Sequence, residues 1–145
     1  MKNNLLELNL NEINISFDES YHVYKENPLY KNRFTSVMSF HPPGVAAVQD
    51  GNIAYHINLK GEPIYERKFL KTFGYYLDIA AVQDNSGWYH IDLSGSPIYN
   101  ERYDWVGNFQ EDRCTVRENS GDFCHVKKDG RFAYEEKYRY AGDYK

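Results

Sequence analysis

The sequence has little of what marks several common protein classes. It holds only 2 cysteines in 145 residues, too few for a scaffold held together by disulfides. No apolar run approaches the 18 residues of a membrane-spanning helix, and the mean hydropathy is −0.75, so we expect no contact with a membrane. The first residues also lack the unbroken apolar stretch of a signal peptide, which favours a cytoplasmic location.

An excess of positive charge is missing as well. Lys and Arg number 17 against 21 Asp and Glu, which gives a formal net charge of −4. Proteins that bind nucleic acid depend on basic side chains that neutralise phosphates, and they usually gather them in a patch or stripe. We therefore expect no nucleic acid as a main partner.

Alanine is scarce, and aromatic residues are abundant. The chain has 14 Tyr, 8 Phe and 2 Trp against 7 Ala, and nearly as many aromatics as the 25 Ile, Leu and Val combined. Helical bundles are rich in Ala and Leu, whereas aromatic residues favour strands. No segment shows a convincing helical pattern of three turns. The composition therefore predicts an all-β protein.

A repeat of about 34 residues organises the chain. Residues 55–65 read YHINLKGEPIY and residues 89–99 read YHIDLSGSPIY, with weaker copies at 21–30 and 124–134. A basic residue followed by an aromatic comes after each copy, so the whole unit recurs rather than one short motif. We predict four repeats, the last incomplete, after an N-terminal cap or closing strand: 1–20, then 21–54, 55–88, 89–123 and 124–145.

Each repeat is predicted to be a short antiparallel β-meander. The Asp50-Gly51 pair favours a two-residue hairpin turn, which would set Val48 opposite Ile53. A second turn at Lys60-Gly61 would set Ile57 opposite Ile64. It would also set His56 opposite Tyr65.

Residues 55–59 alternate between apolar and polar types, which predicts a strand with one apolar and one polar face. Tyr55 and Ile57 would lie in the core, while His56 and Tyr65 would lie on the partly exposed face.

Repeats of this length favour stacking as an open solenoid. Closure into a small barrel or a propeller-like ring remains the alternative. An unpaired edge recruits other strands, so residues 1–20 either cap the first repeat or pair with the last one. If the incomplete last repeat stays unpaired, self-association through it is possible.

The repeat resembles a known family. Residues 87–95 read GWYHIDLSG, and a later Gly107-Asn-Phe109 leads to Cys114-Thr-Val116. These segments, within a resemblance that covers residues 21–145, are similar to the WG-repeat (KWG-repeat) family of bacterial proteins. The resemblance implies an all-β tandem-repeat module from bacteria, with no common enzymatic activity and a role in binding.

The repeated histidines are the first candidate site. His22, His56, His90 and His125 occupy equivalent positions, but stacked repeats lie about 10 Å apart, whereas zinc needs its ligands about 2 Å away. We therefore predict no metal and no cofactor. Each His and the Tyr opposite it form a cross-strand pair, which either packs structurally or contributes to a binding face. The candidate binding residues are His56, Tyr65, His90, Tyr99, His125, Tyr134 and Arg102.

Catalytic patterns are weak. No Ser stands in a nucleophile elbow, and the repeated carboxylates Glu66, Glu101 and Glu136 are each followed by a basic residue, which favours solvated ion pairs. Cys114 and Cys124 would face each other across a hairpin centred near Asn119, and we expect both to be reduced.

We therefore predict a non-enzymatic module that binds a protein or peptide through the Tyr/His face. The alternatives are binding of a carbohydrate or small ligand through exposed aromatics, and a purely structural repeat that caps or spaces a larger assembly.

Overall fold

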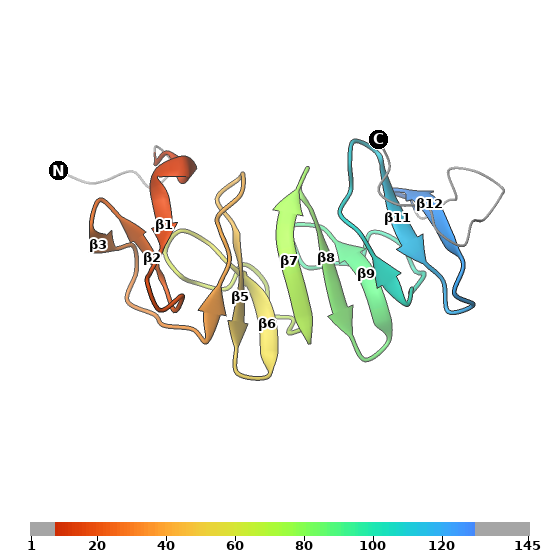
Figure 1. Cartoon of the computed structure of the whole chain (residues 1–145), viewed down its shortest axis with the longest axis horizontal. Coiled ribbons are helices and arrows are strands. Elements are labelled where there is room, and N and C mark those ends of the chain that lie inside the picture. Colours follow the sequence, from red (N-terminus) through yellow and green to blue (C-terminus); the bar gives the residue numbers. More distant parts are fainter. Residues whose placement is uncertain (1–7, 130–145) are drawn as a thin grey trace. The chain divides into compact units, whose positions relative to one another are not determined.

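The computed structural model describes residues 8–129 (Figure 1). One 3-10 helix, η2 (Leu10–Glu12), is the only helix over this range, so the all-β prediction is confirmed. The strands are β1 (Ile13–Ile15), β2 (His22–Tyr24), β3 (Asn27–Pro28), β4 (Ser36–Val37), β5 (Ala46–Asp50), β6 (Ile53–Ile57), β7 (Lys71–Tyr76), β8 (Ile79–Asp84), β9 (Gly87–Ile91), β10 (Trp105–Val106), β11 (Arg113–Arg117) and β12 (Phe123–Lys127).

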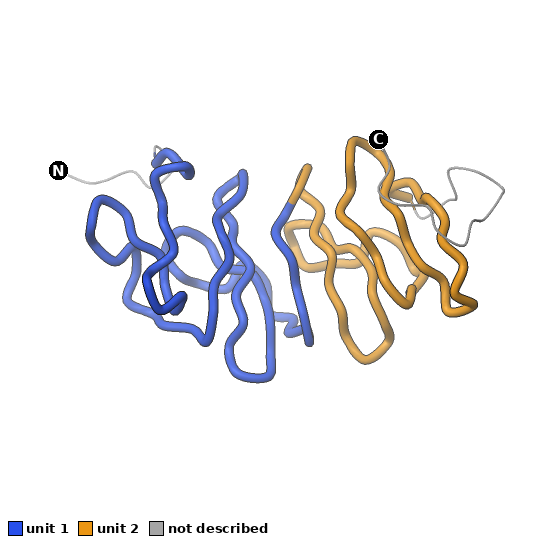
Figure 2. The backbone as a smooth tube through the Cα atoms, viewed as in Figure 1, with its two compact units in different colours: residues 1–75 blue, residues 76–145 orange. Residues whose placement is uncertain are grey.

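The strands form four three-stranded sheets, ordered β1-β2-β3, β4-β5-β6, β7-β8-β9 and β10-β11-β12. The chain divides into two compact units, residues 1–75 and 76–145, shown in different colours in Figure 2. The first two sheets belong to the first unit, the last sheet belongs to the second, and the boundary runs through β7.

The repeat determines which place each strand takes in its sheet. The repeated His lies on the third strand of the later sheets, namely β6, β9 and β12, but on β2 in the first sheet. In the first two sheets the His-bearing strand is followed by a proline that pairs with it. Val23 pairs with Pro28, just as Ile57 bridges Pro63. β1 pairs with β2 and therefore corresponds to the second strand of the later sheets.

The predicted register of the first hairpin turn is wrong. Asp50 pairs with Ile53 and Val48 with Tyr55, so Gly51 and Asn52 form the turn. Gly51 supplies the positive φ of 65° at the first central position. The equivalent hairpin of the second unit shows why the Asp lies before the turn: the Asp84 carboxylate accepts hydrogen bonds from the Ser86 N–H at 2.8 Å and from the Tyr89 hydroxyl at 2.5 Å.

The second turn is longer than predicted. Ile57 bridges Pro63 rather than Ile64, because the Asn58 side chain accepts hydrogen bonds from two N–H groups of the loop, Lys60 at 2.9 Å and Glu62 at 3.1 Å. An asparagine that bonds its own loop in this way stabilises a wider turn than the two-residue one.

The two cysteines also lie in a different register. Cys114 pairs with Val126 and Cys124 pairs with Val116, so the cysteines are diagonal neighbours rather than directly opposite. Diagonal Cα atoms in a sheet lie about 7–8 Å apart, which is too far for a disulfide without movement of the backbone. Neither cysteine is in a disulfide, and both are buried.

Candidate functional site

The Tyr/His pairs lie in the core, not on a surface. His56 exposes 0% and His90 1% of its area, while Tyr65 exposes 8% and Tyr99 6%. The prediction of a partly exposed Tyr/His face is therefore wrong. A second aromatic ring covers each histidine, Tyr75 on His56 at 4.5 Å between ring centroids and Phe109 on His90 at 4.6 Å. Both faces of the third strand are consequently buried.

Each buried histidine makes the same two hydrogen bonds. Nδ1 lies 2.6 Å from the Tyr30 hydroxyl in His22, 2.5 Å from that of Tyr65 in His56 and 2.6 Å from that of Tyr99 in His90. Nε2 lies 2.7–2.8 Å from a backbone carbonyl, in order those of Met38, Phe73 and Gly107.

These contacts fix the tautomer, because a carbonyl oxygen can only accept. Nε2 carries the proton and donates it to the carbonyl, and Nδ1 accepts from the tyrosine hydroxyl.

Burial also keeps these rings uncharged. It lowers the pKa of His56 and of His90 to about 4, although the hydrogen bond to the backbone carbonyl opposes the shift. The pKa of His22 is lowered for the same reason. Burial raises the pKa of Tyr99 well above its usual range. All of these groups are therefore neutral near pH 7.

The histidines connect successive sheets. His22 lies on β2, but its Nε2 reaches the carbonyl of Met38, directly after β4 of the next sheet. His56 on β6 reaches Phe73 within β7, and His90 on β9 reaches Gly107, directly after β10. Each link joins the His-bearing strand of one sheet to the first strand of the next sheet. We call these contacts the His–Tyr links; their role is structural.

A second aromatic contact extends each link. Tyr30, Tyr65 and Tyr99 pack edge-on against the aromatic residue that follows them, with centroids 5.8–6.0 Å apart. That residue is Phe34 or Phe69 in the first unit but Tyr103 in the second. The Tyr103 hydroxyl is buried and has no hydrogen-bond partner.

Arg102 also holds the fold together. Its guanidinium lies 3.7 Å from the centroid of the Tyr89 ring, and it donates to the carbonyls of Asn100 and Glu101 and to the Ser86 hydroxyl at 3.0–3.1 Å. Arg33 repeats this arrangement over Tyr21 at 3.8 Å. A guanidinium stacked on a ring and bonded to turn carbonyls stabilises the turn, so these contacts already engage the guanidinium predicted to bind a partner.

The fourth repeat is described only in part. His125 lies on β12 opposite Thr115 and is half-buried. Tyr134, also predicted to bind, lies outside the described residues. Between residues 8 and 129 no three His, Cys, Asp or Glu side chains are grouped so that they could hold a metal ion. No helix over that range has the length and apolar character needed to cross a membrane.

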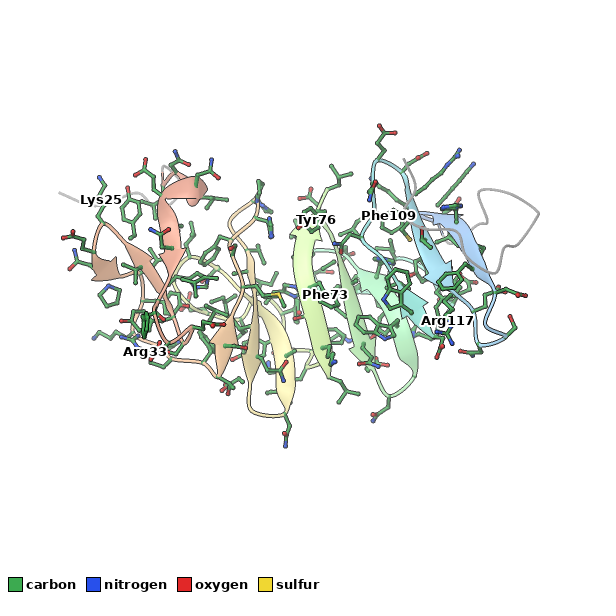
Figure 3. The ribbon with its side chains drawn as sticks, viewed as in Figure 1. Lys25, Arg33, Phe73, Tyr76, Phe109 and Arg117 are labelled. Carbon is green, nitrogen blue, oxygen red and sulfur yellow. The ribbon has the colours of Figure 1, made fainter. Side chains whose placement is uncertain are left out.

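Large apolar side chains on the first strands, or directly after them, are exposed to solvent. Met38 is 42% exposed, Phe73 40% and Trp105 39%, and Phe73 is labelled on β7 in Figure 3. The residue beside each of them points inward, as Val37, Thr72 and Val106 are all at most 5% exposed. The sequence did not predict this alternation of exposed and buried residues, because these segments show neither a clear strand period nor a clear helix period.

A small groove lies beside Met38 in the first unit. It encloses about 120 Å³ and is lined by Ser36, Met38, Ala47, Val48, Gln49 and Thr72. Its lining carries no charged side chain and combines apolar atoms with the polar groups of Ser36 and Gln49. Such a groove suits one side chain of a peptide better than a charged substrate.

Comparisons with known proteins assign no family. No family and no curated protein matches the sequence, so the resemblance to WG repeats stays a prediction. Among solved structures, BamB from Moraxella catarrhalis matches with a TM-score of 0.48 and 12% identity, over 82% of this chain. The match spans only 40% of that protein. At this level of similarity it bears on neither the fold nor the function of this chain.

Proposed function

We propose that the protein is a non-enzymatic interaction module, built from WG-like repeats, that binds a protein or peptide through the exposed side chains of its first strands. The observation that carries the proposal is the exposed apolar side chain of Met38, which lines the groove together with Thr72, and the exposed side chain of Phe73 at the equivalent position of the next sheet. Exposed apolar side chains next to a groove are typical of binding surfaces.

The division of labour within the repeat supports this proposal. The histidines and tyrosines that recur in the repeats bond to each other in the His–Tyr links. The residues at the first strands, in contrast, differ from one repeat to the next. One position holds the exposed Met38 and Phe73 but the buried Gly107, and the position two residues earlier holds the exposed Lys71 and Trp105 but the half-buried Ser36. In a repeat protein a constant interior with a varied surface suits recognition of one particular partner.

Binding of a carbohydrate has less support, because it relied on exposed, evenly spaced tyrosines. Tyr65 and Tyr99 are both buried and cannot stack on a sugar ring. Catalysis has no support from the His–Tyr links, whose groups are neutral and engaged with one another.

The test is affinity capture with cross-linking from a native lysate, using the wild type and the double variant Met38→Ser/Phe73→Ser. We expect the variant to lose at least about tenfold of a specific captured protein, since a single interface anchor often contributes more than about 1 kcal/mol. Ile53→Ser is the matched control, because Ile53 is 37% exposed in the same unit but lies at a hairpin turn. Equal capture by the wild type and the double variant would rule out this surface.

A further inference from the structure

The outer edge of β1 lacks the neighbour that its counterparts have. β5 and β11 are the second strands of their sheets, and a first strand, β4 or β10, pairs with each. β1 holds the same position, since Ile15 pairs with His22 as Ala47 pairs with His56 and Thr115 with His125. Over residues 8–129 no strand pairs with the other edge of β1.

The exposure of β1 agrees with a missing strand. Ala46, Ala47 and Val48 on β5 are all at most 3% exposed, whereas the residues of β1 are half-buried or exposed. In the turn directly after β1, Phe17 is fully exposed at 105%. In β5 the corresponding residue is Gln49, which pairs with Ser36 on the first strand.

The turn after β1 is nevertheless held in place. The Ser16 hydroxyl donates to Asp18 at 2.8 Å, and Asp18 also accepts from the Ser20 hydroxyl at 2.7 Å. The Glu19 carbonyl accepts from the Val37 N–H at 2.9 Å. Phe17 is therefore an exposed aromatic on a fixed backbone, so ordering this turn adds little entropic cost to binding.

The known first strands define what the edge would bind. Thr35 and Met38 donate their N–H groups to the carbonyls of Gln49 and Ala47, both at 2.9 Å. Asp104 and Gly107 donate to Arg117 and Thr115, both at 2.8 Å. The equivalent acceptors at the edge of β1 are the carbonyls of Phe17 and Ile15.

One further segment of the sequence has the pattern of a first strand. Residues 102–107 read RYDWVG, and residues 137–142 read KYRYAG. Both begin with a basic residue and a tyrosine, and both end with a small or β-branched apolar residue and glycine. Residues 137–142 lie outside the described residues. By the same alignment Arg139 corresponds to Asp104 and Gly142 to Gly107.

We propose that the edge of β1 binds residues 137–142 of a second copy of this chain, as an added antiparallel strand. The N–H groups of Arg139 and Gly142 would donate to the carbonyls of Phe17 and Ile15, and Tyr140 would cover Phe17. A second copy is favoured because the chain already makes the same step from the last strand of one sheet to the first strand of the next sheet. The association is head-to-tail, so it builds chains or rings of copies.

Disulfide trapping tests the register. In a hydrogen-bonded antiparallel pair the Cα atoms lie about 5.5 Å apart, within the range for a disulfide. We would mix ¹⁵N-labelled Phe17→Cys chains with unlabelled Tyr140→Cys chains in a glutathione buffer. The expected product is a covalent dimer of one labelled and one unlabelled chain, at least about ten times more abundant than with Lys25→Cys, an exposed turn residue of the same sheet. The native cysteines are buried in all variants.

The other outcomes overturn the proposal. Equal yields from Phe17→Cys and Lys25→Cys would show random collision. A cross-linked monomer from the double variant, without the mixed dimer, would show that the segment of the same chain occupies the edge. No cross-link at all would mean that something else, such as residues 1–7, covers β1.

Light scattering gives an independent readout. The average mass of the native chain should rise with concentration. Arg139→Pro, which removes the donating N–H, should abolish that rise while Arg139→Ala retains it. Circular dichroism on both variants would show that the fold is kept, and a constant monomer mass for the native chain would contradict the proposal.

Discussion

Two tyrosines of the second unit allow the same atom to be removed in two different settings. The Tyr99 hydroxyl donates to Nδ1 of His90 at 2.6 Å, whereas the Tyr103 hydroxyl is buried without a partner. Tyr99 is 6% exposed and Tyr103 is 4% exposed, and their rings pack edge-on at 5.9 Å. The substitutions Tyr99→Phe and Tyr103→Phe therefore differ only in what the lost hydroxyl was bonded to.

The expected free energies of unfolding differ in sign or size. Tyr99→Phe removes a buried hydrogen bond and leaves Nδ1 of His90 without a donor, which costs about 1–3 kcal/mol. Tyr103→Phe removes a hydroxyl that had been desolvated without compensation, so its effect should be neutral or stabilising. Phe34 and Phe69 already occupy the equivalent positions, which shows that the repeat accepts phenylalanine there.

Urea unfolding followed by circular dichroism measures the difference. With a slope of about 1–3 kcal/mol per molar urea, Tyr99→Phe should lower the midpoint by roughly 1 M, while Tyr103→Phe should leave it unchanged or raise it. Because both residues lie in the same unit, both changes act on the same transition. Equal destabilisation by the two substitutions would refute the structural role of the His–Tyr link.

Three further predictions concern stability. Burial lowers the pKa of His56 and His90 from about 6.5 in the unfolded chain to about 4, so the unfolded chain binds more protons than the folded chain between these values. We expect full stability above pH 6.5 and a fall of about 1.4 kcal/mol per pH unit for each histidine as the pH drops toward 4. A flat acid profile in urea titrations would contradict this. Thr72→Val should raise the free energy of unfolding by about 1 kcal/mol, because the Thr72 hydroxyl is buried without a hydrogen-bond partner at a position where other repeats have valine. A lower melting temperature would show that the hydroxyl makes a hydrogen bond in the folded protein. Gly61→Ala should lower the free energy of unfolding more than Gly51→Ala. Both positions need a positive φ, but only at Gly61 would a Cβ meet the Tyr30 ring, at 2.7 Å. Equal losses of stability in thermal melts would argue against that packing.

The sequence was informative where the repeat multiplies a signal. The aromatic excess and the recurrence of residues 55–65 at 89–99 predicted strands and sheets that recur with the repeat, and the all-β class is confirmed. Turn registers were less predictable, because they depend on side chains that bond their own loop, such as Asn58 and Asp84. A two-residue turn preference cannot reveal that contact.

The candidate site was mispredicted for a physical reason. Alternation along 55–59 correctly places His56 and Tyr55 on opposite faces, but it does not show whether the second face is covered. Here the aromatic ring of Tyr75, on β7 of the next sheet, covers His56, which is fully buried. A buried histidine paired with a tyrosine looks the same in sequence as an exposed one. The exposed Met38 and Trp105 gave no periodic signal because β4 and β10 each have only two residues.

The ring nitrogens of the histidines provide the most direct test of the central claim, which is that the repeated His–Tyr pairs connect neighbouring sheets rather than form a binding face. Two-dimensional ¹⁵N NMR of the histidine side chains distinguishes a protonated nitrogen from an unprotonated one. For His56 and His90 we expect Nε2 protonated and Nδ1 unprotonated, with both rings neutral down to about pH 5. Titration with a midpoint near 6.5, or a proton on Nδ1 at neutral pH, would contradict the account.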